Sequence, residues 1–268
     1  MPKTINIIGL GLIGTSLARD AIRTGWEVHG FERDPGNRAT ASAILKRPVE
    51  PLEAPLPPAD LTALCTPPAD ILDRLPRLLD APPGAIFDVA SVKTPIAKAV
   101  ARHPNRARYV SAHPMAGREL SGPRAAVDAL FRNRPCLFCD TDHSNPSDYA
   151  QVRAFLLNDC AMFPAEMSSE AHDRHVAVIS HMPHILAFVL NNLVWTEPDV
   201  QPQLGGTGLD GMIRLAKSDP LLWRDILATN AQALDAPLAK AIDHLIQIRN
   251  ALQTGDADAL ARHILRRP

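Results

Sequence analysis

Residues 4–14 read T-I-N-I-I-G-L-G-L-I-G and decide the fold of the amino-terminal half. A short apolar run ends in a G-x-G-x-x-G turn, after which residues 12–25 place apolar side chains at helical spacing. This order predicts a strand, a tight turn and a helix. In that setting Gly9 permits the turn, Gly11 lets the backbone approach a pyrophosphate, and Gly14 lets the helix pack closely on the sheet.

The residues around this turn are expected to bind a dinucleotide. Leu12 and Ile13 open the helix, whose amino-terminal N–H groups and partial positive charge attract phosphate. Glu32 ends the next apolar strand, where a carboxylate accepts hydrogen bonds from ribose hydroxyls and repels a 2′-phosphate. Arg33 could instead receive that phosphate. The predicted cofactor is therefore NAD, with NADP left open.

Strand-like and helix-like segments alternate up to about residue 166. Beyond the first two strands, we expect strands at 60–65, 85–89, 108–112, 136–139 and 161–165, and helices at 35–43, 69–79, 93–102 and 147–158. Prolines crowd residues 46–59, which predicts an exposed loop there. The alternation predicts a doubly wound, mostly parallel sheet with helices on both faces.

The pattern changes near residue 168 to long helices, expected at 169–195, 219–254 and 256–266. We therefore expect an α/β dinucleotide-binding domain over 1–166 and an all-helical domain over 167–268. The last helices are amphipathic, so they could pack on their own domain or on a second subunit.

Composition narrows the class of partner. The 268 residues include 28 Lys and Arg against 29 Asp and Glu, a net charge of −1, which argues against nucleic acid or an anionic membrane and favours a small-molecule partner. The amino terminus lacks the cationic lead of a signal peptide, and no uninterrupted apolar run reaches about 18 residues. The four cysteines lack disulfide-framework spacing, which predicts a cytoplasmic protein. Cys136 and Cys139 form a C-x-x-C that we interpret as buried strand rather than a metal site.

Three further segments gather polar residues: D88-V-A-S-V-K93, S111-A-H-P-M-A-G-R-E119 and H172-D-R-H-V-A-V-I-S-H-M-P-H184. Together with the glycine turn they resemble the prephenate and arogenate dehydrogenase family of tyrosine biosynthesis. The resemblance continues through G205-G-T-G-L-D-G-M-I-R214 and S218-D-P-L-L-W223 to Asn230. It implies a Rossmann domain, a helical domain that forms a homodimer, and oxidative decarboxylation of prephenate or arogenate with hydride transfer to NAD(P)+, giving 4-hydroxyphenylpyruvate or tyrosine.

The resemblance also assigns residues to the reaction. His113 matches the catalytic histidine that takes the proton of the ring hydroxyl, and His184 matches a second histidine at the reacting centre. Ser91 matches a serine between substrate and nicotinamide, while Thr66 and Pro67 match the cofactor-side loop. Substrate carboxylates near His113 would raise its pKa in the complex.

The helical half would supply the substrate contacts. Arg214 matches the arginine that binds a substrate carboxylate, and Glu119 a gating carboxylate at the pocket mouth. The remaining substrate-binding candidates are Trp223, Asp173, Ser180, His181 and His184. An H-x-x-H can bind zinc, but no further ligand stands at suitable spacing and the family needs no metal, so we expect none.

Several alternatives stay open. Gly211 stands where many members carry an acidic residue, and Asp210 is one place earlier, so prephenate, arogenate and 4-amino-4-deoxyprephenate are not distinguished. A dehydrogenase of β-hydroxy acids would place a catalytic lysine in the helical half, and no such motif surrounds Lys217 or Lys240. A non-catalytic NAD-sensing protein would need neither His113 nor Arg214. Feedback inhibition by tyrosine is also open.

Overall fold

One eight-stranded sheet forms the amino-terminal half of the computed structural model, which describes residues 2–81 and 84–265. The strand order is β3-β2-β1-β4-β5-β6-β7-β8, and within these residues only the β6–β7 pair is antiparallel. The strands are β1 (Thr4–Ile8), β2 (Glu27–Glu32), β3 (Val49–Pro51), β4 (Leu61–Leu64), β5 (Ala85–Asp88), β6 (Tyr109–Pro114), β7 (Pro135–Cys139) and β8 (Phe163–Met167). The predicted mostly parallel sheet is confirmed.

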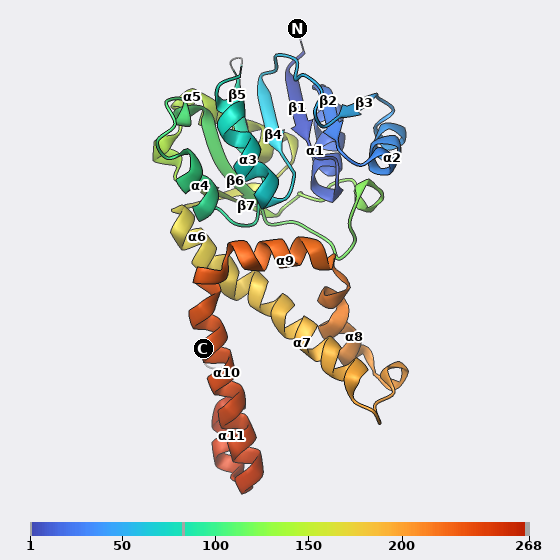
Figure 1. The fold of residues 1–268 in the computed structure, drawn as a ribbon, viewed down its shortest axis with the longest axis vertical. Coiled ribbons are helices and arrows are strands. Elements are labelled where there is room, and N and C mark those ends of the chain that lie inside the picture. Colours follow the sequence, from blue (N-terminus) through green and yellow to red (C-terminus); the bar gives the residue numbers. More distant parts are fainter. Residues whose placement is uncertain (1, 82–83, 266–268) are drawn as a thin grey trace.

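Helices cover both faces of this sheet (Figure 1). They are α1 (Leu12–Arg23), α2 (Pro35–Leu45), α3 (Pro68–Leu79), α4 (Thr94–Val100) and α5 (Pro146–Ala154). Apolar side chains of α1, α2 and α5 join one buried cluster, and those of α3 and α4 join a second cluster on the opposite face. This arrangement is the doubly wound fold predicted from the alternation.

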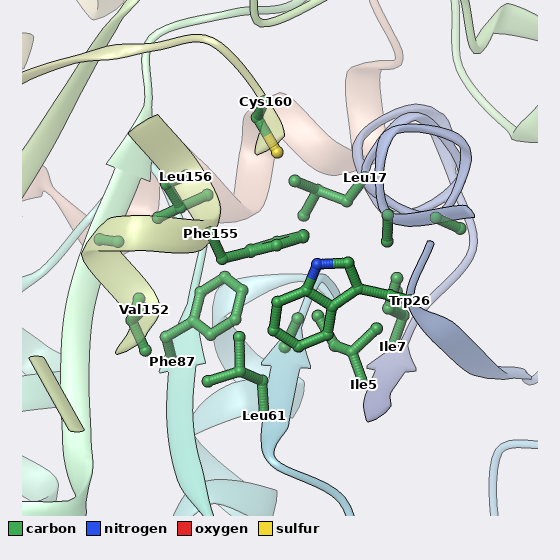
Figure 2. Close-up of a cluster of buried hydrophobic side chains, with 14 of the residues drawn as sticks. Ile5, Ile7, Leu17, Trp26, Leu61, Phe87, Val152, Phe155, Leu156 and Cys160 are labelled. Carbon is green, nitrogen blue, oxygen red and sulfur yellow. The ribbon is translucent and has the colours of Figure 1, made fainter. Parts of the chain in front are cut away.

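Aromatic side chains fill the first cluster, as Figure 2 shows. The Phe155 ring meets Trp26 edge to face, with ring centroids 5.2 Å apart, and lies 6.1 Å from the Phe87 ring. The Trp26 indole N–H also donates to Asp159 at 3.1 Å. Burying side chains of this size stabilises the fold by about 1.5–3 kcal/mol each, so the sheet half is a rigid platform for its loops.

The second half is helical and more open. Its elements are α6 (Ser169–Val176), a π-helical turn (Ala177–His181), α7 (Met182–Thr196), α8 (Thr207–Ile213), a 3-10 turn (Arg214–Lys217), α9 (Pro220–Thr229), α10 (Ala231–Thr254) and α11 (Ala257–Ile264). Figure 1 shows α9 lying beneath the sheet half, while α7 with α8 and α10 with α11 extend away as two diverging limbs.

Three expectations about secondary structure are wrong. The proline-rich loop contains β3, which pairs with β2 at the sheet edge, where a proline at the end of a strand is tolerated. The expected helix 219–254 is two helices, because the chain turns at Asn230 (φ −103°, ψ 18°) between α9 and α10. The short helix α8 was not expected.

The continuous helix Ser169–Thr196 is long and apolar enough, by length and composition, to cross a membrane. The sequence showed no uninterrupted apolar run of this length, because serine, histidine and asparagine side chains interrupt it. The mean hydropathy of the stretch nevertheless stays high. Only 28% of its most apolar window is buried. The core helix of a soluble protein can pass the same test, so this helix by itself is weak evidence for a membrane.

Candidate active site

The glycine turn closes tightly and leaves space at one position. Gly9 has φ +93°, and a Cβ there would lie 2.8 Å from the Thr66 methyl group; a Cβ on Gly14 would lie 1.9 Å from the Gly9 carbonyl oxygen. A Cβ on Gly11 would meet nothing within 4 Å. The backbone therefore requires glycine at positions 9 and 14, whereas position 11 opens onto the start of α1. There the N–H groups of Leu12 and Ile13 have no partner within the helix, so the turn fits a pyrophosphate.

Glu32 is buried at the end of β2 and faces the glycine turn. Its carboxylate accepts hydrogen bonds from the backbone N–H of Leu10 at 2.8 Å and of Asp34 at 3.0 Å. A carboxylate can accept about four hydrogen bonds, so this side chain can hold the turn and still accept from a ribose hydroxyl. The predicted cofactor role of Glu32 stays a prediction that this geometry permits.

The neighbouring cofactor candidates lie along the same edge of the sheet. Thr66 follows β4, and Pro67 caps the start of α3. Arg33 follows β2 with its side chain 62% exposed and forms an ion pair with Asp70 in the first turn of α3. Its guanidinium therefore already has an anionic partner.

A fully buried ion pair supports the loop that follows β5. The Lys93 ammonium donates to Asp88 at 2.7 Å and also to the Ala112 carbonyl oxygen, and the Tyr109 hydroxyl donates to Asp88 at 2.8 Å. Buried charges are tolerated only when paired and hydrogen-bonded. The pair joins β5 to β6 immediately before His113. Sequence reasoning assigned Asp88 and Lys93 no role. A lysine close to a buried apolar strand nevertheless requires a negatively charged partner, and Asp88 at the end of that strand was available.

His113 lies in β6 at the end of a hydrogen-bonded chain that crosses between the two halves. Its Nδ1 is 2.8 Å from His172 Nε2, and His172 Nδ1 is 2.8 Å from Asp173 Oδ1. The two Asp173 oxygens accept the backbone N–H groups of Lys93 and Thr94, both at 2.8 Å. Asp173 was expected among the substrate-binding residues; its side chain is buried beside His172 with both oxygens engaged, and the expectation stays a prediction. Sequence reasoning missed His172.

The chain fixes the protonation of His113. Burial, and then His172 and Lys93, lower the pKa of His113 well below 6.5. Burial raises the pKa of Asp173, but hydrogen bonds from His172 and Thr94 outweigh it and hold that pKa below its usual value. Burial also lowers the pKa of His172, against the effect of Asp173. With Asp173 ionised and His172 neutral, His172 Nδ1–H donates to Asp173 and its Nε2 accepts Nδ1–H of His113. His113 is thus left with a lone pair on Nε2, where a general base needs it.

His181 and His184 form a wall from the helical half. The Asn230 amide donates to His181 Nδ1 and to the Asp173 carbonyl oxygen, both at 3.0 Å. The His184 ring stacks on Trp223 of α9 with centroids 3.5 Å apart, and its Nδ1 donates to the carbonyl oxygen of Ser180 at 3.0 Å. Sequence reasoning quoted Asn230 without giving it this positioning role.

Burial keeps both of these rings neutral. It lowers the pKa of His181 to about 4 and also lowers that of His184, to which the Arg214 charge contributes. Since His181 Nδ1 accepts from Asn230, its hydrogen sits on Nε2, which is buried and has no hydrogen-bond partner among the described residues. His181 therefore carries a buried, neutral N–H donor, and both Nδ1 atoms of the H-x-x-H are occupied.

The last candidates lie at the boundary between the halves. Arg214, in the turn after α8, donates to Glu119 in the loop after β6 at 3.2 Å, and its side chain is 54% exposed. The structure thus pairs the predicted carboxylate ligand with the predicted gating residue. Ser91 is half-buried between β5 and α4, and Gly211 and Asp210 are exposed on α8.

A glycine turn over a helix start, an acidic residue ending β2 and a neutral histidine facing a helical half define a two-domain, nucleotide-binding dehydrogenase. Residues 17–163 match the family model "prephenate dehydrogenase, nucleotide-binding domain", and residues 168–266 match "prephenate dehydrogenase, dimerization domain". The chain belongs to the prephenate dehydrogenase family, as its sequence motifs predicted.

Individual relatives agree with this assignment. The chain is 31% identical to the cyclohexadienyl dehydrogenase of Zymomonas mobilis, over 97% of this chain and 92% of the relative. It is 28% identical to the arogenate dehydrogenase structure from Synechocystis, with a TM-score of 0.75 over 97% and 95% of the two chains. Prephenate dehydrogenase from A. aeolicus, solved with hydroxyphenyl propionate and NAD+, is 23% identical with a TM-score of 0.84 over 98% and 95% of the chains, a likeness of fold.

Proposed function

We propose that this chain oxidises and decarboxylates a cyclohexadiene carboxylate, prephenate or arogenate or both, with NAD as the hydride acceptor. The observation that carries the proposal is the buried, neutral His113, whose Nε2 lone pair is left free by the chain through His172 to Asp173. The names of the relatives support the substrate class without choosing between its members.

The residues of this chain divide the work. His113 Nε2 takes the proton of the ring hydroxyl as that oxygen becomes a carbonyl. NAD, when bound, supplies the acceptor for the hydride that leaves the same ring carbon. Loss of the ring carboxylate as CO2 then gives the aromatic product: the electron pair of the broken bond enters the ring, and the former carbonyl oxygen takes its proton back from His113. We place the remaining substrate carboxylate on Arg214, which would exchange Glu119 for the ligand.

The surrounding residues exclude water and orient the ring. Trp223 and the stacked His184 give an apolar wall, and His181 Nε2–H offers a donor whose direction Asn230 fixes. Glu32 and the space over Gly11 fit the ribose and pyrophosphate of the cofactor. Ser91 would lie on the nicotinamide side, as the family resemblance implies.

The assembly and the compartment complete the proposal. The match to a dimerization domain and the exposed apolar side chains of the two limbs support a homodimer. The four cysteines are free thiols, which supports a reducing, cytoplasmic location.

The test is to offer purified protein prephenate, arogenate and the 4-amino analogue, each with NAD and with NADP, and to follow reduced nicotinamide and released CO2 together. We expect both products in equal amounts from prephenate or arogenate with NAD. Reduced nicotinamide without CO2, or no turnover of any of the three, would contradict the proposal.

A variant tests the substrate-binding part of the proposal. Arg214→Ala should raise KM for the best substrate about 10- to 100-fold, as expected for losing a hydrogen-bonded charge, and leave NAD affinity unchanged. Arg224, which is exposed and pairs with its neighbour Asp225, provides the matched control Arg224→Ala. An unchanged KM in Arg214→Ala would assign the carboxylate to another residue.

A further inference from the structure

A four-residue charge network lies beside the expected ribose site and takes no part in the proposed reaction. Arg33 pairs with Asp70, and Arg74 donates to the other Asp70 oxygen at 2.7 Å. Glu53 lies 3.5 Å from Arg74 and 3.9 Å from the Nε of Arg33. The four residues come from the end of β2, the loop after β3 and the first turns of α3.

The position of Arg33 gives this network its meaning. It directly follows Glu32, where an arginine in a dinucleotide-binding fold can bind the 2′-phosphate that distinguishes NADP from NAD. In this structure its guanidinium is turned to Asp70; the Arg33 side chain is 62% exposed and that of Asp70 is 16% exposed, so only the carboxylate side of the pair is shielded from water. An incoming 2′-phosphate would have to displace Asp70 or bind beside it.

We propose that Asp70 is a cofactor-specificity residue: by binding the Arg33 guanidinium it withholds that cation from a 2′-phosphate and thereby favours NAD over NADP. The inference rests on the proposed use of a nicotinamide dinucleotide. It resolves the ambiguity that Arg33 creates in the sequence, since the same arginine beside a neutral residue would favour NADP. The negative charges of Asp70 and Glu53 next to Arg33, with Glu32 adjacent to it in sequence, would also repel a 2′-phosphate that approaches this arginine.

Direct binding measurements on the purified wild-type protein and its variants test this without turnover. The dissociation constants of NADH and NADPH are measured by nucleotide fluorescence and by calorimetry. Asp70→Asn keeps the shape of the side chain and removes its charge. We expect the NADPH dissociation constant to fall about tenfold, equivalent to about 1.4 kcal/mol, while that of NADH stays within about twofold, which is under 0.5 kcal/mol.

Three further variants separate release of Arg33 from other effects. Asp73→Asn removes a charge from the same helix, where Asp73 pairs with Arg77 and not with Arg33, and should change neither constant. Glu53→Gln weakens the network at its exposed end and should give a smaller gain in the same direction. Arg33→Ala combined with Asp70→Asn should abolish the gain, because the phosphate ligand is then absent.

The outcomes that overturn the inference are distinct from failure of the proposed function. NADPH affinity unchanged in Asp70→Asn, a gain that survives the loss of Arg33, or wild-type protein that binds NADPH as tightly as NADH would each overturn it while leaving dehydrogenase activity untouched. Wild-type protein that binds neither nucleotide would overturn the proposed function as well. Thermal unfolding of each variant shows whether the fold is retained.

Discussion

The two halves of this molecule build their cores differently. The sheet half has buried apolar clusters on both faces of the sheet. The helical half has two small clusters, centred on Trp223 and on Met182, and leaves large apolar side chains exposed along both limbs. The exposed apolar residues of the π-helical turn before α7, of α7 and of α10 are, in chain order, Val178, Ile179, Leu186, Val189, Leu193, Trp195, Ile242, Leu245, Ile246 and Leu252. The first half completes its core alone, whereas the second matches a dimerization domain and has apolar surface left for a partner.

The largest effect is expected where the halves meet, at His113. His113→Asn removes the base but keeps a hydrogen-bonding side chain, so kcat should fall by about 10² to 10⁴ with NAD affinity unchanged. Steady-state kinetics at saturating substrate and NAD, with a separate NADH binding assay, measure both. A variant that keeps more than about a tenth of wild-type kcat would remove His113 from the chemistry, since one general base accounts for at least about a hundredfold.

A core substitution in the sheet half comes next. Phe155→Ala leaves a cavity beside Trp26 and Phe87 and should lower the free energy of unfolding by about 3–5 kcal/mol. Urea denaturation followed by tryptophan fluorescence measures the change. The control is Phe163→Ala on β8, where the ring is 51% exposed and truncation should cost much less. Equal losses of unfolding free energy in the two variants would contradict the idea that Phe155 is more tightly packed than the exposed Phe163.

A charge introduced on α10 should test whether a second copy covers the exposed apolar side chains of the helical half. Leu245 is 57% exposed on α10, so Leu245→Glu should change the stability of an isolated chain by only about 0.5 kcal/mol. If a second copy covers this face, the buried charge should weaken the dimer at least about 100-fold, or about 2.7 kcal/mol. Analytical ultracentrifugation over a range of concentrations measures the dissociation constant. Gln247→Glu puts the same charge at an exposed polar position of α10 as a control; equal dissociation in both would contradict the assigned face.

The smallest effect is a dependence of stability on pH that originates in the helical half. Burial lowers the pKa of His181 in the folded state to about 4, below the unfolded value of about 6.5. Between these two pH values the unfolded chain therefore binds a proton that the native state does not bind. Its stabilising contribution is complete above pH ~6.5 and is lost as the pH falls from there towards 4, by about 1 kcal/mol per pH unit. Urea midpoints between about pH 7 and 5 should show a shallower slope in His181→Gln than in wild type.

The exposed His143 supplies the matched control for this slope. His143→Gln should leave the pH dependence of the urea midpoint as it is in wild type. A slope unaffected by His181→Gln would show that other buried groups determine the acid sensitivity.

Local patterns in the sequence predicted most of the fold. Strand and helix periodicities are properties of neighbouring residues, so the order of β and α elements and the change to helices near residue 168 were visible without the structure. The break at Asn230 was not, because apolar spacing continues through it and asparagine does not force a helix to end as proline does. The strand β3 was hidden because its three residues, Val-Glu-Pro, are too few to show a periodic signal and lie in a proline-rich segment.

The sequence predicted the motifs of the site but not the side-chain contacts between them. His113, His184, Arg214 and Trp223 were found by resemblance, whereas the contact between His113 and His172 joins residues 59 positions apart. Such a pair depends on how the two halves dock, which a single sequence does not encode locally. The same holds for Asp173, which was found by resemblance and whose oxygens accept the backbone N–H groups of Lys93 and Thr94, 80 and 79 positions away.

The π-helical turn at Ala177–His181 keeps the two ends of one long helix in phase. Such a turn amounts to one residue more than an α-helix needs between the same ends, and each residue of an α-helix advances the helix by about 100°. His172 precedes the turn, whereas His184 and the apolar face of α7 follow it. Deleting one exposed residue of the turn, such as Val178, would therefore give a regular α-helix with His172 and His184 still on the same faces, whereas a deletion within α7 after His184 would rotate the rest of α7 by about 100°. The alignment of His172 and His184 with the exposed apolar face of α7 thus tolerates the loss of one residue in the turn, but not in the regular helix that follows it.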